Sequence, residues 1–300
     1  MKTALMLIMI AALLLPAGQA LAADTSKEIT VNFVPMHFII DGVEYTPPAD
    51  QPGFLYVTDD NKAHTYVPLR FVANILYRSV GWDGAAIKVT VANPAPTIEA
   101  DLAKQVVENS VIEPVDKSKL QRTKIVANKA DITYIFDGNQ VQPNSETPGF
   151  IYQGRTYVPL RFMYNSLGYD NDHIAFDGDT YTITATSTED QLAYRGILKS
   201  YAAELEEIFL QAESELTGFA FENASKALKG THEEKLALYE EGEVILGKWK
   251  VLLLDKIDEM SNELTEASLS ADIAADYTSF YQEKEDAKRL QAKTLLGLTE

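Results

Sequence analysis

The chain has 300 residues, of which 46% are hydrophobic, and it carries a formal net charge of −18 at pH 7 without a single cysteine. This content of apolar side chains is sufficient for the cores of two or three domains. The charge argues against nucleic acid as a partner and equally against adsorption of the whole chain to anionic lipid, because polyanions require a basic footprint.

The first residues have the pattern of a secretory signal peptide. Lys2 is followed by an apolar run over residues 4–15, then by Pro16 and the small-x-small sequence Ala20-Leu21-Ala22. A membrane anchor is the weaker alternative, because the run is shorter than the roughly 20 residues that span a bilayer. We therefore expect residues 1–22 to be cleaved, which leaves an exported protein without a membrane span.

A sequence motif that occurs twice indicates an internal duplication. The two copies of this motif consist of Thr65, Tyr66, Val67, Pro68, Leu69 and Arg70, and of Thr156, Tyr157, Val158, Pro159, Leu160 and Arg161. Asp41-Gly42 and Asp137-Gly138 extend the match at an offset of 96 residues. Two copies of roughly 60 residues form small domains rather than a solenoid, which requires at least about three repeats. We expect module 1 at residues 28–92, a linker with a short helix at 93–122, and module 2 at 123–186.

Each copy is predicted to form a small antiparallel sheet packed on one short helix. Asp-Gly between apolar runs is a strong hairpin signal, and a second hairpin is expected around Gln153-Gly154. The proline of each motif cannot donate to a strand ladder but suits the first turn of a helix. Helices are therefore expected at 69–78 and 160–167. Gly168 ends the second helix, whereas Tyr77 stands at the corresponding position of the first.

Further matched segments flank the motif. Pro-Gly-Phe-Ile-Tyr precedes Gly-Arg-Thr-Tyr-Val-Pro-Leu-Arg-Phe in copy two, and Leu-Gly and an aromatic-Asp pair follow it. Over residues 28–91 and 124–185 these segments resemble the copper amine oxidase N-terminal domain family, also called stalk domains. The resemblance implies modules that occur in secreted and cell-surface proteins of Gram-positive bacteria, often in tandem and joined to unrelated domains.

The same resemblance does not imply oxidase activity. In the oxidases the catalytic machinery lies in a separate, larger domain with three histidine copper ligands and a quinone derived from tyrosine. The four histidines of this chain are scattered, and none is paired as His-x-His. A Gly-x-Ser-x-Gly elbow, a phosphate loop, a His-Glu-x-x-His motif and a thiol nucleophile are all absent from the sequence. We predict a non-enzyme with no catalytic residue and no cofactor, in which His64 beside the first motif is a loop residue.

Three sets of side chains are weak candidates for binding. Four acids offer the hard oxygen donors that Ca²⁺ prefers, although solvated turn acids are the favoured interpretation: Asp170, Asp172, Asp177 and Asp179. Four rings that flank turns could form a platform for a sugar: Phe54, Tyr56, Phe150 and Tyr152. Arg70 and Arg161 could clamp a carboxylate or sulfate, although bracing of the strand–helix junction is favoured.

The last third of the chain has helical periodicity. Apolar residues recur three and four positions apart from Leu198, from Ile245 and, less regularly, from Ile273, which predicts helices near 188–227, 232–267 and 271–297. Thr231-His-Glu-Glu234 is a capping box for the second helix, and Ser270 is a plausible cap for the third. From Glu189 onward there are 24 acidic and 12 basic residues. A self-contained bundle with a solvated acidic exterior is favoured over one with a seam left open around Trp249.

The sequence therefore predicts an α+β protein, in which two small antiparallel-sheet-plus-one-helix modules are followed by an all-α antiparallel three-helix bundle at 188–300. The expected function is that of an exported, non-enzymatic structural or binding protein of the bacterial cell surface or extracellular space, in which stalk modules present a helical domain. The alternative is a carbohydrate-binding module for cell-wall or environmental polysaccharide. Expected partners are a cell-wall glycan or another surface protein, and self-association through the helical region is a further option.

Overall fold

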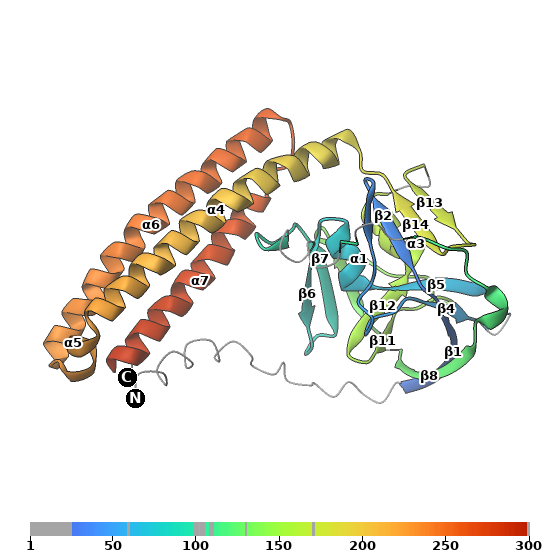
Figure 1. Cartoon of the computed structure of the whole chain (residues 1–300), viewed down its shortest axis with the longest axis horizontal. Helices are drawn as coiled ribbons and strands as arrows, with labels where there is room; N and C mark the ends of the chain where they lie inside the picture. Colours follow the sequence, from blue (N-terminus) through green and yellow to red (C-terminus); the bar gives the residue numbers. More distant parts are fainter. Residues whose placement is uncertain are drawn as a thin grey trace.

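A computed structural model describes residues 26–58, 61–98, 102, 106–107, 111–129, 131–169 and 172–298. The predicted signal peptide and most of the predicted linker helix lie outside these residues. Two parts are evident in Figure 1: a unit built around a β-barrel, here called the barrel unit, and a long bundle of helices that extends away from it, here called the helical arm. The α+β fold class predicted from the sequence is confirmed.

Both copies of the repeat contain the same order of elements. Copy one comprises β1 (Ser26–Phe33), β2 (His37–Ile40), β3 (Val43–Tyr45), β4 (Phe54–Val57), β5 (Ala63–Pro68), α1 (Leu69–Ile75), β6 (Ser79–Asp83) and β7 (Lys88–Ala92). After the short 3-10 helix η1 (Lys117–Lys119), copy two comprises β8 (Arg122–Asn128), β9 (Thr133–Phe136), β10 (Asn139–Val141), β11 (Phe150–Tyr152), β12 (Arg155–Pro159), α3 (Leu160–Ser166), β13 (Ile174–Asp177) and β14 (Thr182–Ala185). The predicted hairpins at the two Asp-Gly pairs and the helix after each motif proline are confirmed.

The expectation that each copy forms its own antiparallel sheet is wrong. All three sheets combine strands of both copies: the closed barrel has the order β1-β4-β5-β12-β11-β8, and the two four-stranded sheets have the orders β10-β9-β7-β6 and β13-β14-β2-β3. The two copies meet in parallel in the outer sheets, through β14 with β2 and β7 with β9. A two-stranded hairpin is only marginally stable alone, and pairing it with a hairpin of the other copy gives a sheet that can cover a core.

The duplicated motif pairs with itself. In the antiparallel contact between β5 and β12, Val67 lies opposite Val158, and each motif tyrosine lies opposite the proline of the other copy. An approximate two-fold axis therefore passes between the two valines. Each proline then ends its strand and serves as the N-cap of the helix that follows.

The barrel unit has two clusters of buried apolar side chains. The barrel interior is filled by Ile29, Val31, Phe54, Tyr66, Ile125, Ala127, Phe150 and Tyr157. The rings of Phe54 and Tyr66 are stacked there, with their centroids 5.4 Å apart. The second cluster contains α1, α3 and the inner faces of the outer sheets, and it continues into the arm through Leu198, Leu205 and Tyr277. The barrel unit and the near end of the arm therefore share one apolar core.

The arm consists of α4 (Glu189–Glu222), the short α5 (Ala224–Lys229), α6 (His232–Glu266) and α7 (Ile273–Leu296). The three long helices confirm the predicted bundle, and the predicted capping box of Thr231 and Glu234 begins α6. Near the start of α7, the Ser270 hydroxyl oxygen accepts a hydrogen bond from the backbone N–H of Asp272 at 3.3 Å. With 34 residues, α4 is about 50 Å long. Among the described helices, none combines the length and apolarity needed to cross a membrane.

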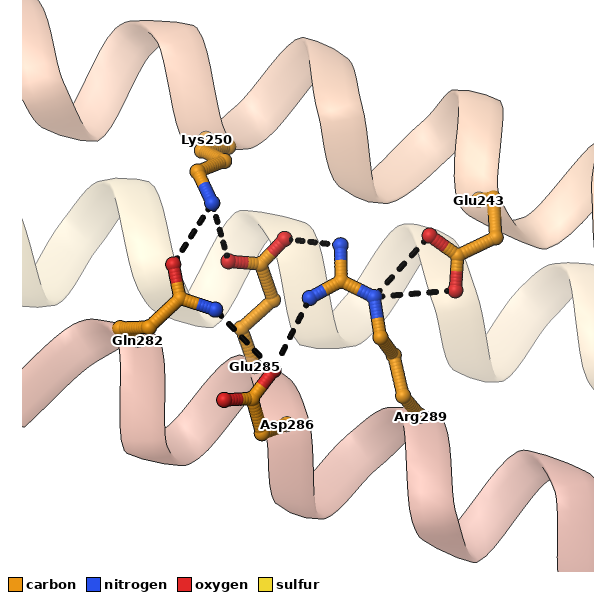
Figure 2. A network of polar contacts seen from close by, with 6 residues as sticks. All are labelled: Glu243, Lys250, Gln282, Glu285, Asp286 and Arg289. Carbon is orange, nitrogen blue, oxygen red and sulfur yellow. Dashed lines mark hydrogen bonds and ion pairs between the residues drawn. The ribbon is translucent and has the colours of Figure 1, made fainter.

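Polar contacts link α6 and α7 in the half of the arm that lies away from the barrel (Figure 2). The Arg289 Nε donates to both carboxylate oxygens of Glu243 at 3.0 Å, and Arg289 also pairs with Glu285 and Asp286 of its own helix. Lys250 of α6 pairs with Glu285 at 3.1 Å. Such networks fix which residues face each other, and they depend on every member keeping its charge.

Because the copies share every sheet, we expect them to unfold together. Val67→Ala and Val158→Ala each remove buried atoms at the contact between β5 and β12, and each should lower the free energy of unfolding by about 2 kcal/mol. Urea unfolding followed by circular dichroism and tyrosine fluorescence should give one transition for the barrel unit. Val126→Ala, on the exposed face of β8, is the control and should change stability by no more than about 0.5 kcal/mol. Separate transitions for the two copies would contradict the shared-sheet architecture.

The network of Figure 2 predicts that the arm weakens in acid. Partial burial alone would raise the pKa of Glu243, but hydrogen bonds with Tyr239 and Arg289 outweigh it and hold this pKa below its ordinary value. A carboxylate with a lowered folded-state pKa stabilises at neutral pH, and its contribution disappears as pH falls through that value. Glu243→Gln should therefore lower the midpoint of thermal unfolding at about pH 7 and have little effect at about pH 3. The exposed Glu240→Gln is the control, and an equal effect of Glu243→Gln at both pH values would refute the prediction.

Candidate functional site

The predicted sugar-stacking rings do not form a platform. Phe54 and Phe150 are 0% and 1% exposed because they point into the barrel, where a ring cannot stack on a ligand. Tyr56 and Tyr152 are half-buried and pack against the same interior. Side chains alternate along β4 and β11, and this alternation directs Phe54 and Phe150 inward. The position of the rings next to turns, on which the prediction was based, does not show this direction.

The two motif arginines do not brace the strand–helix junction as expected. Arg70 and Arg161 are each the second residue of a helix, α1 or α3, and both are exposed. Neither guanidinium forms a hydrogen bond or an ion pair with any residue that the structure describes. The preceding leucine of each motif takes the buried side of the helix instead. A clamp on a carboxylate or sulfate stays a prediction.

The candidate calcium ligands lie in and around the hairpin of β13 and β14. Asp177 accepts hydrogen bonds from the Asp179 backbone and the Thr180 hydroxyl, both at 2.8 Å, and these contacts hold the pKa of Asp177 below its ordinary value. Asp179 forms an ion pair with Lys117 at 2.8 Å. Asp170 lies outside the described residues, and no three metal-binding side chains gather among those that are described. The described geometry is that of turn acids.

At Trp249, where an open seam was the less favoured expectation, α6 contacts α4. The ring of Trp249 is half-buried between α4 and α6, and its indole N–H donates to Glu215 Oε2 at 2.7 Å. Lys248 binds the same carboxylate at 3.1 Å and lies over the indole ring.

The polar side chains that do converge are found where the arm joins the barrel unit, and Asp41 is central among them. Asp41 and Gly42 form the turn between β2 and β3, with φ of 52° and 82°. One carboxylate oxygen of Asp41 accepts from the backbone N–H of Ser187 at 2.7 Å. The other accepts from the Ser187 hydroxyl at 2.8 Å and from Arg195 Nη1 of α4 at 2.9 Å. A single carboxylate therefore holds the chain on both sides of the N-terminus of α4.

The Tyr77 ring packs against the same Arg195 side chain. The Arg195 guanidinium lies over the Tyr77 ring, 5.1 Å from its centroid. Tyr77 has a φ of 61°, close to the 78° of Gly168 at the corresponding position of copy two. A tyrosine in this left-handed conformation costs roughly 1–2 kcal/mol, which glycine avoids. The substitution thus keeps the helix end of copy one and adds a ring on which Arg195 can stack.

A second group of contacts, beside the first, is centred on Asn93. The amide of Asn93 accepts a hydrogen bond from the Tyr194 hydroxyl of α4 at 3.3 Å and donates to Asp276 of α7 at 3.1 Å. Burial, with smaller contributions from neighbouring aspartates, raises the pKa of Tyr194 to about 12, so its hydroxyl stays a donor at neutral pH. In the repeat, Asn93 corresponds to Ser187, but Asn93 binds Tyr194 and Asp276 of the arm, whereas Ser187 binds Asp41 of copy one.

Between these contacts lies a cleft of about 550 Å³, which is lined by both copies and by the starts of α4 and α7. Its charged side chains include Arg78, which pairs with Asp137 at 3.6 Å, and Arg195, which is bound by Asp41. The residues that line it include no nucleophile with an adjacent base. The cleft has the size of a small-ligand site, but its polar groups mainly connect the arm to the barrel unit.

The residues of this junction were not identified as a site in the sequence. Asp41 and Asp137 stand in identical Asp-Gly pairs, and each is explained by its turn alone. Their difference is purely spatial, since Asp41 binds Arg195 of α4, whereas the side chain of Asp137 pairs with Arg78 among the residues that the structure describes. The only sequence signal near this junction is the acidic composition from Glu189 onward, which marks where the arm begins.

Comparison with known proteins supports the resemblance for copy two. The model of the family described as copper amine oxidase N-terminal domain matches residues 135–218, a segment that runs from β9 through β14 and into α4. The match contains the second motif but not the first, and it crosses the predicted boundary between module and bundle. No curated protein and no solved structure matches the chain.

The junction predicts that the two Asp-Gly turns respond differently to the same substitution. Asp41→Asn keeps the turn but replaces a buried carboxylate oxygen with an amide that faces donors, so the free energy of unfolding should fall by about 2–3 kcal/mol. Asp137→Asn is the matched control and should cost less than about 1 kcal/mol, because Asp137 is 46% exposed. Urea unfolding measures both, and hydrogen exchange at the start of α4 should accelerate only in Asp41→Asn. Equal effects of the two substitutions would show that Asp41 has no special part in holding the arm.

Proposed function

We propose that this chain is an exported, non-enzymatic structural or binding protein of the bacterial cell surface or extracellular space, whose barrel unit holds the helical arm in a fixed direction. The observation that carries the proposal is the junction itself. Asp41 binds both Ser187 and Arg195, and the apolar core runs without a break from the barrel unit into α4 and α7. An arm on a loose linker would require neither feature.

Sequence patterns support the location. The N-terminal residues have the charge, length and small-x-small end of a secretory signal peptide. The family match covers copy two, and the pairing of equivalent strands across the approximate two-fold axis supports the interpretation of residues 28–92 as a second copy of the same module. Tandem modules that carry a different domain are what the family resemblance implies.

The alternative of a carbohydrate-binding module has lost its main support. It relied on exposed coplanar rings beside the hairpin of β11 and β12, and Phe150 is inside the barrel. Tyr152 is half-buried and engaged with Gln153, whose side-chain amide donates to its hydroxyl at 3.1 Å. The structural role is therefore the better supported of the two.

A distance measurement tests whether the arm is held rigidly. The chain contains no cysteine, so spin labels can be placed at Val126→Cys on β8 and Ser225→Cys on α5 without background. Double electron–electron resonance should give one narrow distribution of the distance between the two labels, because they are expected to lie at opposite ends of one rigid body. Adding Asp41→Ala should broaden it. A broad or multiple distribution in the otherwise unchanged protein would refute the proposed role.

A further inference from the structure

The far end of the arm presents apolar side chains to solvent. There α4 ends at Glu222 and α5 follows after one residue, Asn223 (Figure 1). Asn223 separates the two helices: its N–H donates to the Phe219 carbonyl oxygen of α4, and its carbonyl oxygen accepts the first hydrogen bond of α5 from the Ala227 N–H at 2.9 Å. Phe221 at the end of α4 and Ala224 and Leu228 of α5 are spaced three and four residues apart in the sequence across this joint, and all three are exposed. We call these three residues the tip stripe.

The tip stripe is oriented opposite to an ordinary amphipathic helix. Phe221 is 84% exposed and Leu228 is 75% exposed, and Ala224 is exposed as well. The half-buried side of the same segment carries Asn223 and Ala227. A surface helix normally turns its apolar side inward, and single exposed apolar residues need no explanation. Three at helical spacing, including the most exposed large hydrophobic side chain of the described residues, indicate a surface that meets something apolar.

The charge of the tip differs from the average charge of the arm. Residues 223–232 contain Lys226, Lys229 and His232 and no acid, whereas the region from Glu189 onward has twice as many acidic as basic residues. Glu222 and Glu233 border the segment. The Glu234 carboxylate is engaged in the capping box, where it accepts from the Thr231 backbone N–H at 2.7 Å. Residues 223–232 are thus a stretch of the arm that carries positive but no negative side chains.

We propose that the tip of the helical arm docks end-on to an anionic lipid surface. Phe221 and Leu228 enter the boundary between headgroups and acyl chains, and Lys226 and Lys229 reach the lipid phosphates. A lipid surface has an anionic headgroup layer above an apolar acyl layer. The lysines of this tip match the first layer and its apolar side chains match the second. A soluble polyanion would leave the tip stripe in water.

The length of the arm reduces the repulsion expected from the net charge of −18, because the charges of the barrel unit and of much of the shaft lie far from the tip. Electrostatic repulsion between exposed charges is screened beyond about 8–10 Å at physiological ionic strength. Because α4 is about 50 Å long, an end-on arm keeps the acidic barrel unit several screening lengths away from the lipid. The inference rests on the proposed function in this respect, since only an arm that is held out rigidly keeps this separation.

Vesicle sedimentation tests the inference with the chain that begins at Ala23, which lacks the apolar segment that would itself enter lipid. Vesicles of equal parts phosphatidylglycerol and phosphatidylcholine should sediment the protein, and binding should weaken as salt is raised. The double substitution Phe221→Ser with Leu228→Ser should reduce the partition coefficient at least about tenfold. Lys226→Gln with Lys229→Gln should abolish the preference over phosphatidylcholine alone.

The matched control is Val244→Ser, which changes a side chain that is 74% exposed on the shaft of α6 and should leave binding unchanged. Binding that survives Phe221→Ser with Leu228→Ser, or absence of binding to either vesicle, overturns the inference. Self-association that these two substitutions abolish, without vesicle binding, would assign the tip to a second copy and also overturn it. If the spin-label distances are narrow while vesicles are not bound, the rigid-support role stands and the lipid inference alone fails.

Discussion

The antiparallel contact between β5 and β12 is the interaction on which the barrel unit depends. Each strand belongs to one copy of the motif, and Val67 faces Val158 across the approximate two-fold axis. The motif prolines end both strands immediately beyond this contact and begin helices, so neither strand can extend the pairing. The copies also pair through β1 with β8, β2 with β14 and β7 with β9. Closure into a barrel leaves the central sheet without free edges, which protects the fold from pairing with another chain.

The duplication matters because the copies have diverged where they meet the arm. Both retain the Asp-Gly turn and the left-handed helix end, but copy one uses them to hold α4. Asp41 binds Ser187 and Arg195, and Tyr77 accepts a strained backbone and places its ring beneath Arg195. Copy two keeps the unstrained Gly168 and uses Asp137 only for Arg78. One copy of an almost symmetric scaffold thus holds the helical arm through Arg195.

The interior of the arm changes along its length. Near the barrel its core is apolar and continuous with that of the barrel unit, through residues such as Leu205 and Met260. Farther out, Arg289 and its acidic partners connect α6 with α7 (Figure 2). Stability is expected to decrease along the arm in the same direction, because exposed polar contacts protect less than apolar packing.

Local patterns in the sequence determined where the strands and helices of this protein lie. Contacts between distant residues determined which strands pair and which side chains are buried. Periodicity, the Asp-Gly turns, the motif prolines and the Thr231 capping box located the strands, helices and caps, because these depend on neighbouring residues alone. The sharing of all three sheets, the burial of Phe150 and the outward position of Arg161 were decided by the tertiary structure. Strand partners and inward-facing sides are set by residues about 90 positions apart, and a duplicated sequence satisfies pairing within a copy and between copies equally well. Only the closed packing of both copies distinguishes Asp41, which holds the arm, from Asp137, which stands in the same turn.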